Sequence, residues 1–144
     1  MAIIPSVVID TNILVTALRS NRGASYKLVS LIGTGLFEVN LSVPLFVEYE
    51  AILVRECPNF SAITPQDIYK LLNFVAGVSI KREIYYLWRP FLRDPNDDLV
   101  LEVAVNAGCQ RIITYNLRDF RGCERFGIQP ITAREFLQEL GVLQ

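Results

Sequence analysis

The sequence predicts an α/β fold, a three-layer sandwich in which helices flank a central, mostly parallel sheet. Short apolar runs alternate along the chain with longer segments in which apolar residues recur at helical spacing. Strands that are separated by helices pair in parallel, because a parallel connection needs a crossover. No linker, repeat or low-complexity segment interrupts the alternation, so we expect a single domain over residues 1–144.

Five runs have the character of strands. The first and the fourth are short and largely apolar, as expected of strands that are buried on both faces of a sheet. The second has an alternating character, and the third and the fifth are brief. The predicted strands are residues 6–9, 37–41, 78–80, 112–114 and 128–131.

The helices are marked by their first residues. Ser42 and Thr64 are good N-caps ahead of segments with helical spacing. Thr132 and Glu135 have the pattern of a capping box, and Asp98 opens a helix that a glycine ends. The predicted helices are residues 12–19, 24–32, 43–55, 65–75, 98–107 and a final helix from residue 133.

The composition narrows the chemistry. The chain contains no histidine, which removes the commonest general base, so any hydrolysis would depend on metals and carboxylates. No apolar stretch approaches the ~20 residues of a membrane span, and the first residues lack the basic region of a signal peptide. The cysteines have neither the even count nor the close spacing of a disulfide framework. We expect a cytoplasmic protein with free thiols at Cys57, Cys109 and Cys123.

The charge balance bears on the partners of the protein. With a net charge of −1 and only three lysines, the chain lacks the basic composition of a protein that binds nucleic acid by electrostatics alone. Four arginines nevertheless lie within fifteen residues near Asp119. They are either solvated loop charges or phosphate contacts. These residues are Arg111, Arg118, Arg121 and Arg125.

Four acidic residues carry most of the functional information. Asp10 ends the first apolar run, and Glu48 lies just inside a helix. Asp98 opens another helix, and Asp119 follows the fourth run. An α/β fold brings such positions together at one edge of the sheet, where ligands bind. Carboxylates that converge there repel one another unless cations are bound, so the arrangement points to Mg²⁺ or Mn²⁺ and to phosphate chemistry.

Each acidic residue also has a structural explanation. Asp10 is an ordinary candidate for a helix N-cap, although Thr11 and Asn12 after it give more polar side chains than a cap needs. Asp97 and Asp98 are favoured at a helix start by the helix dipole. Taken singly, each signal is weak. Taken together, the order and spacing of the acids are difficult to attribute to chance.

Five segments, in order, resemble those of a known family. Residues 7–12 are an apolar strand followed by Asp-Thr-Asn, and in residues 42–49 a serine precedes an acid by six positions. Residues 94–108 have Asp98 at the third acidic position of the family, residues 112–120 contain a closing threonine motif, and the ending at residues 127–137 is also similar. The chain resembles the PIN domain family over nearly its whole length, and more narrowly the toxin components of bacterial and archaeal toxin–antitoxin pairs.

The resemblance implies a Mg²⁺- or Mn²⁺-dependent ribonuclease that hydrolyses RNA phosphodiester bonds. Toxin members are often homodimers, and a small antitoxin protein holds them inactive. The implied catalytic and metal-binding residues are Asp10, Glu48, Asp98 and Asp119. The implied supporting residues are Thr11, Asn12, Asp97, Thr114 and Asn116, and the candidates for substrate phosphate are Arg118 and Arg121.

One residue departs from the family pattern. Many members have an aspartate where this chain has Asn116, and here the carboxylate comes three residues later, at Asp119. An amide oxygen can bind Mg²⁺ but supplies no charge. The main alternative is therefore a PIN-type module that binds protein or RNA without catalysis.

Other functional classes have less support. A phospho-acceptor receiver domain needs a lysine after a late strand, and no lysine follows Lys81. A phosphatase with an aspartyl nucleophile needs a second aspartate at the position of Asn12. Glycine-rich phosphate loops are absent from the sequence, so nucleotide-triphosphate and dinucleotide enzymes are not indicated.

Overall fold

A fully parallel sheet forms the centre of the structure, a computed structural model that describes residues 4–84 and 91–144. The strands are β1 (Ser6–Ile9), β2 (Glu38–Leu41), β3 (Ile80–Lys81), β4 (Arg111–Ile113) and β5 (Gln129–Ile131). Their order across the sheet is β3-β2-β1-β4-β5, and each neighbouring pair is parallel. In β1, Val7 is in register with Val39 of β2 and with Arg111 of β4.

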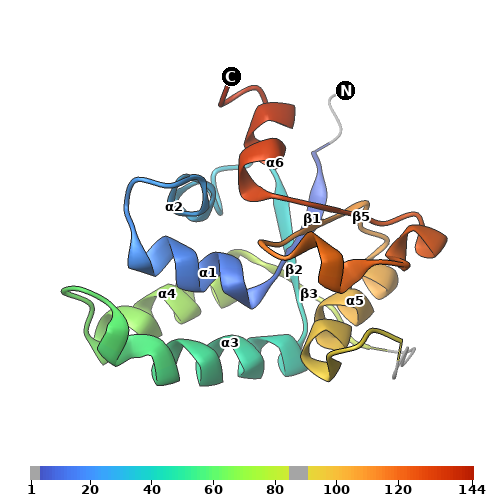
Figure 1. Cartoon of the computed structure of the whole chain (residues 1–144). Coiled ribbons are helices and arrows are strands. Elements are labelled where there is room, and N and C mark those ends of the chain that lie inside the picture. The colour runs from blue at the N-terminus through green and yellow to red at the C-terminus, as the bar shows by residue number, and fades with distance from the viewer. Residues whose placement is uncertain (1–3, 85–90) are drawn as a thin grey trace.

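Helices cover both faces of this sheet, which confirms the predicted three-layer α/β fold. They are α1 (Thr11–Arg19), α2 (Ala24–Ser30), α3 (Val43–Glu56), α4 (Pro65–Val78), α5 (Pro95–Ala107) and α6 (Ala133–Glu139). α5 packs against β1, β2 and β4, whereas α1 and α2 pack together on the other side of the strands (Figure 1). α3 packs against α1 and α4, and α6 packs against α2. Right-handed crossovers between parallel strands produce this distribution.

The core is most deeply buried at β1, β4 and α5. Val7–Ile9 and Ile112 with Ile113 are at most 1% exposed, as predicted for strands buried on both faces. α5 is buried from Val100 to Ala104, because it crosses the middle of the sheet. β2 does not show the predicted alternation: Asn40 in its middle is buried like its neighbours, since both faces of the sheet are covered.

Some element boundaries differ from the predicted ones. α5 begins at Pro95 with Asp94 as its N-cap, so Asp98 lies inside the first turn and does not open the helix. Val78 still belongs to α4, and β3 starts only at Ile80. Asp97 and Asp98 therefore both lie in the first turn of α5, behind its N-cap.

The helix caps also correct one prediction. The hydroxyl of Thr132 accepts a hydrogen bond from the backbone N–H of Glu135, as predicted. The Glu135 carboxylate, however, accepts from the Thr132 hydroxyl and not from its backbone N–H, so the predicted capping box is incomplete. A complete capping box occurs at α4, where Thr64 and Asp67 exchange both hydrogen bonds.

The structure bears on two further expectations. Cys57, Cys109 and Cys123 are free thiols, as predicted. In the described part of the chain, each helix is too short or too polar to cross a membrane.

The strand order creates a switch point between β1 and β4. The chain passes from β1 to β2 and β3 on one side, then crosses to β4 and β5 on the other. The loops that leave the carboxyl ends of β1 and β4 therefore turn to opposite faces, and ligands of open parallel sheets bind in the crevice between such loops. The backbone N–H of Asp10 donates to the carbonyl of Ile113 at 2.8 Å, which joins the two strand ends.

Candidate functional site

A cavity of about 300 Å³ lies at this switch point and collects residues from distant segments of the chain. We call it the acidic cavity, because its charged side chains are carboxylates apart from the guanidinium of Arg55. The carboxylates that line it are those of Asp10, Glu48, Glu56, Asp94, Asp97 and Asp119. Thr11, Asn12 and Asn116 add neutral polar groups to its wall.

Asp10 lies at the end of β1 and is 7% exposed. It occupies the N-cap position of α1, yet its side chain makes no capping hydrogen bond. Its Oδ2 atom instead accepts a hydrogen bond of 2.8 Å from the hydroxyl of Thr114, the residue that follows β4. Asp10 thus has the position of a cap without the contacts of one, and its carboxylate lines the acidic cavity.

Glu48 reaches the acidic cavity from the second turn of α3. Its Oε2 atom accepts a hydrogen bond of 2.5 Å from the hydroxyl of Thr11. The next residue, Tyr49, is fully buried, and its hydroxyl donates to the carbonyl of Ile9. These bonds tie α3 to the chain on both sides of Asp10, so they fix Glu48 relative to that carboxylate.

Asn12 and Thr114 connect the start of α1 to the loop after β4. Asn12 Oδ1 accepts a hydrogen bond of 3.1 Å from the backbone N–H of Tyr115, and its Nδ2 donates to Thr114 Oγ1 at 3.5 Å. The same Thr114 oxygen accepts from the backbone N–H of Asn116 at 3.1 Å. One buried hydroxyl therefore links Asp10, Asn12 and the loop that carries Asn116.

Asp119 enters the acidic cavity from a short 3₁₀ helix, Leu117–Phe120. Phe120 is fully buried and anchors this segment to the core. Asn116, which precedes the 3₁₀ helix, lines the same cavity. The acidic cavity is therefore lined by two side chains of this segment. One is the amide of Asn116, at the position where many family members have an aspartate, and the other is the carboxylate of Asp119.

The adjacent residues Asp97 and Asp98 have different environments. Asp97 lines the acidic cavity. Asp98 is fully buried, and its carboxylate accepts hydrogen bonds from the backbone N–H groups of Leu92 at 2.9 Å and Phe91 at 3.4 Å. The Asp98 carboxylate is thus engaged by the backbone that precedes α5, whereas Asp97 lines the acidic cavity. The arrangement favours Asp97, predicted as a supporting residue, over the predicted ligand Asp98.

Burial raises the pKa values of two carboxylates in the acidic cavity, and their charged neighbours add to the rise. Burial raises the pKa of Asp10 to about 6; the hydrogen bond from Thr114 opposes this rise, and the charges of Glu48 and Asp119 add to it. Burial likewise raises the pKa of Asp97 to about 7, and the surrounding carboxylates, Asp10 and Asp119 first among them, raise it further. The acidic cavity therefore holds negative charge at neutral pH against an electrostatic cost, which a bound cation would offset.

A family model for the PIN domain matches residues 6–118, most of the chain. The chain belongs to the PIN domain family. The match begins at β1 and includes the segments that carry Asp10, Glu48 and Asp97.

A solved structure with a related fold is that of VapBC2 from Rickettsia felis, bound to a DNA fragment from its promoter. The PIN domain superposes on a chain of that complex with a TM-score of 0.59, over 88% of this chain and 98% of the other. The sequence identity is 13%, so the similarity concerns the fold. No curated protein matches the chain by sequence comparison.

The donor atoms of the PIN domain's acidic cavity suit a hard divalent cation. Its polar side chains offer carboxylate, amide and hydroxyl oxygens, which Mg²⁺ and Mn²⁺ prefer, and contain no histidine or cysteine. Within residues 4–84 and 91–144, however, no three acidic or cysteine side chains are arranged as a complete metal site. The carboxylates would have to move closer together to share one ion.

The stability of the metal-free PIN domain should fall as the pH rises from about 4 to about 7. Aspartates of the unfolded chain have a pKa near 3.8, whereas the pKa values of Asp10 and Asp97 are raised to about 6 and about 7 in the folded protein. In this range the folded state binds more protons than the unfolded state, so the free energy of unfolding decreases with pH. Melting temperatures in EDTA across this range should show the decline, which should be smaller for the Asp10→Asn protein. A steady rise in the parent's melting temperature between these limits would contradict the pKa assignment.

Four polar residues of the acidic cavity were not among the predicted site residues: Arg55, Glu56, Asp94 and Asn96. Arg55 lies two helical turns after Glu48, so the helical period of α3 places both on one face, a signal that was present in the sequence. Asn96 lies in the first turn of α5, where its backbone N–H donates to Asp94 Oδ1 at 2.9 Å. Recognising Asp94 as the N-cap would have indicated that Asn96 lies in the first turn of α5, together with Asp97.

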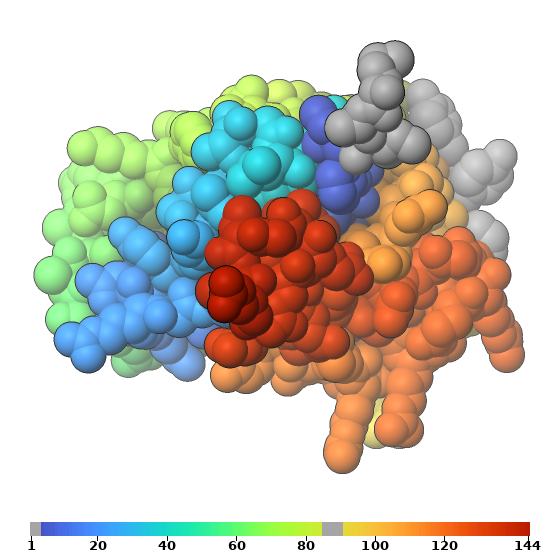
Figure 2. Space-filling model, turned by 90° about the horizontal axis from the view of Figure 1, so that it is seen from above, coloured from blue at the N-terminus to red at the C-terminus, as the bar shows by residue number. Residues whose placement is uncertain are grey.

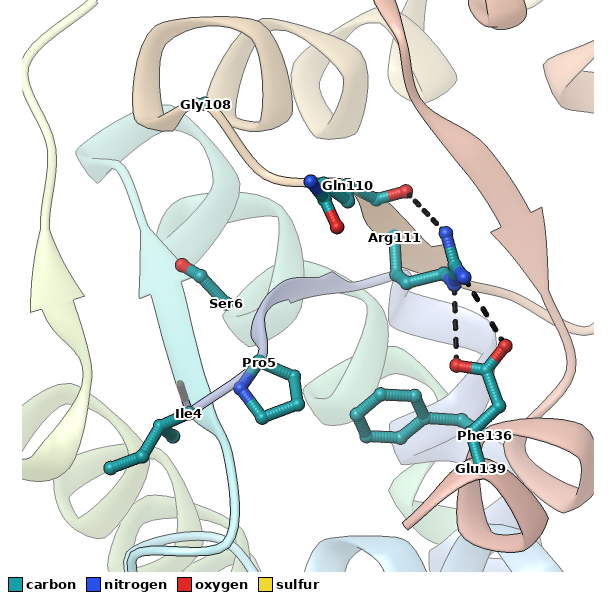
Figure 3. A pocket seen from close by; sticks show the side chains of 8 residues that line it. All are labelled: Ile4, Pro5, Ser6, Gly108, Gln110, Arg111, Phe136 and Glu139. Carbon is teal, nitrogen blue, oxygen red and sulfur yellow. Dashed lines mark hydrogen bonds and ion pairs between the residues drawn. The ribbon is translucent and has the colours of Figure 1, made fainter. Parts of the chain in front are cut away.

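A different cavity lies at the opposite, amino-terminal edge of the sheet (Figure 3). Its lining includes Ser6 at the start of β1 and Arg111 at the start of β4. The Arg111 guanidinium points to Glu139 of α6, with Nε and Nη2 donating to its two carboxylate oxygens at 3.3 and 3.2 Å (Figure 3). Arg111 is thus paired with a carboxylate at the far edge and does not belong to an arginine group beside Asp119, contrary to the grouping that the sequence suggested.

Proposed function

We propose that this PIN domain is an endoribonuclease that hydrolyses RNA phosphodiester bonds, with Mg²⁺ or Mn²⁺ held by Asp10, Glu48, Asp97 and Asp119. The observation that supports the proposal is the convergence of these four side chains, from four segments of the chain, on one cavity at the switch point of the sheet. The raised pKa values of Asp10 and Asp97 add to this support, because they mark a place where cation binding is favoured.

The protein's own residues would prepare the site. The Thr114 hydroxyl restrains the Asp10 carboxylate and the Thr11 hydroxyl restrains that of Glu48, so both retain their orientation when charge is added. When bound, a divalent cation supplies Lewis-acid polarisation of the phosphodiester and a lower pKa for a neighbouring water. Arg118 and Arg121, close to Asp119 in the chain, would contact phosphate oxygens through charge-assisted hydrogen bonds.

We also propose that the protein is the toxin of a toxin–antitoxin pair, with a small antitoxin protein as its partner and a homodimer as its assembly. Membership of the PIN domain family and the likeness of the fold to a chain of the VapBC2 complex support this role. Light scattering coupled to size-exclusion chromatography tests the assembly. A clean monomer at micromolar concentration would remove the homodimer from the proposal.

A binding module without catalysis is the competing function. It is supported by the amide at Asn116 and by the lack, in the described residues, of three side chains already arranged to bind one ion. Such a module should bind divalent cations weakly and should not cleave RNA when they are added.

Cleavage of an RNA pool that contains structured and single-stranded molecules separates the two functions. The parent protein should cut in Mn²⁺ or Mg²⁺ and not in EDTA, and Asp10→Asn protein purified in parallel should cut under none of these conditions. Glu48→Gln and Glu50→Gln form a matched pair, because both lie on α3 and only Glu48 lines the acidic cavity. Cleavage should be lost in the first and retained in the second. A folded parent that leaves the pool intact in both metals, or an Asp10→Asn protein that cuts like the parent, would overturn the nuclease proposal.

A further inference from the structure

A second cavity, of about 430 Å³, is lined by Arg118 and Arg121, the two residues proposed above to contact phosphate. Its lining comprises Arg93, Arg118 and Arg121 together with Phe91, Leu92 and Asp119. We call it the arginine cavity. Because Asp119 lines both spaces, the two cavities are direct neighbours.

The arginine cavity collects positive charge from two segments. Arg93 directly precedes the N-cap of α5, whereas Arg118 and Arg121 lie in and just after the 3₁₀ helix. In the described part of the chain, none of the three guanidinium groups forms an ion pair. Unpaired guanidinium groups around one hollow suit a phosphate, whose oxygens match their hydrogen-bonding geometry.

An exposed aromatic ring lies next to this charge. Tyr115 is 65% exposed and lines a third cavity, of about 630 Å³, together with Asn116, Leu117, Arg118 and Asp119. Its backbone is fixed, because its N–H donates to Asn12 Oδ1. In Figure 2, side chains of the orange region, which includes the segment that follows β4, extend outward from the body of the molecule. A ring held on such a segment can stack on a nucleic acid base.

The negative charge of the protein means that RNA binding requires a local source of positive charge. The chain has a net charge of −1, and the acidic cavity is lined by six carboxylates against one guanidinium. An RNA strand would be repelled from that cavity unless the protein attracted its backbone close by. The arginine cavity provides such attraction directly beside the carboxylates.

We infer that the arginine cavity binds the phosphate next to the bond that is cleaved, and that Tyr115 stacks on an unpaired base of the same strand. The inference rests on the proposed nuclease function, and it assigns binding residues to the part of the RNA strand that extends beyond the acidic cavity. Bases in a duplex are stacked on one another and do not offer a free face to Tyr115.

Binding of a fluorescent single-stranded RNA oligonucleotide to Asp10→Asn protein in Mg²⁺ tests the inference without cleavage. Arg93→Gln, Arg118→Gln and Arg121→Gln, each added to this background, should weaken binding by about 5-fold or more. Each lost phosphate contact should also make the salt dependence shallower, by about 0.7 in the slope of log K against log salt. Lys70→Gln is the matched control, because exposed Lys70 lies on α4, which leads to β3 at the other side of the sheet from β4.

Tyr115 is tested with the same probe. Tyr115→Ala should weaken binding by about 5- to 100-fold, and Tyr115→Phe should bind like the Asp10→Asn background, because the ring and not the hydroxyl stacks. A hairpin in which the same sequence is paired should bind less tightly than the single strand. Melting temperatures close to the background would show that these variants are folded.

The outcomes distinguish this inference from the proposed function. Arginine variants that bind like the Lys70→Gln control, or a hairpin that binds as tightly as the single strand, would overturn the inference even if the parent cleaves RNA. Weaker binding of the probe by the arginine and Tyr115→Ala variants alone would support the inference. A parent that binds the probe as described but cuts no RNA would instead overturn the nuclease proposal and leave these binding cavities supported.

Discussion

Asp10→Asn protein is expected to be inactive as a nuclease and, in EDTA at neutral pH, more stable than the parent. The Asp10 carboxylate is nearly buried, and its pKa of about 6 lies above the ordinary value of 3.8. At neutral pH the parent therefore keeps a charge where the folded state disfavours it. The neutral amide of asparagine removes that charge, and its oxygen can still accept the hydrogen bond from Thr114.

The size of both effects can be bounded. A pKa raised from 3.8 to about 6 corresponds to about 3 kcal/mol, which is the upper limit of the gain in the free energy of unfolding. Loss of a carboxylate that holds the cation should reduce cleavage by about 100-fold or more. Opposite changes in activity and stability are the signature of a functional carboxylate that is held at the expense of stability.

Denaturant unfolding in EDTA, with activity measured on the same preparations, tests this prediction. Asp67→Asn is the control, because the Asp67 carboxylate belongs to the capping box of α4 and its pKa is lowered by hydrogen bonds from Thr64. The same chemical change should destabilise the protein there and leave cleavage intact. An Asp10→Asn protein that is less stable than the parent in EDTA would show that Asp10 serves mainly to hold the fold together.

Asp97 and Asp98 should respond to substitution in opposite ways. Asp98→Ala should lower the free energy of unfolding by about 3 kcal/mol, because it leaves the backbone N–H groups of Leu92 and Phe91 without their acceptor. Asp97→Ala should have little effect on the stability of the metal-free protein or should increase it, since it removes a charge that burial and the neighbouring carboxylates disfavour. Cleavage should be lost in Asp97→Ala.

Asn substitutions at the same two positions control for a loss of activity that is caused by unfolding. Asp98→Asn retains one acceptor oxygen for Leu92 and should be folded well enough to assay, with cleavage preserved. Asp97→Asn should be folded and inactive. The reverse result, an inactive but folded Asp98→Asn and an active Asp97→Asn, would restore Asp98 as the metal ligand that the sequence suggested.

The position of Asp10 could be predicted from the sequence, whereas the different environments of Asp97 and Asp98 could not. Asp10 was placed correctly at the sheet edge because an acid that directly follows a buried strand has to lie at the carboxyl end of that strand. The choice between Asp97 and Asp98 depends on the residue at which α5 starts and on the backbone at Leu92, to which Asp98 binds. A shift of one residue along a helix turns a side chain by about 100°, and no local pattern fixes the start that closely.

Glu48 and Arg93 illustrate two other limits. Glu48 has no distinguishing neighbour in sequence, so only the resemblance to the PIN domain family singled it out; the packing of α3 and the bond from Thr11 give it its place in the acidic cavity. Arg93 joins Arg118 and Arg121 through a contact between distant segments, which composition cannot reveal. The fold was easier to predict than the site, because alternation of strands and helices is repeated many times along the chain whereas each site contact occurs once.

The two edge strands have a consequence for how this protein can associate. β3 has only two residues and includes Lys81, and β5 has Pro130, which lacks an N–H, at its centre. In the part of the chain that the structure describes, neither margin of the sheet therefore presents a long row of backbone donors and acceptors to an incoming strand. Extension of the sheet from one molecule into another is disfavoured, and a second polypeptide would be expected to bind through side chains on helices and loops.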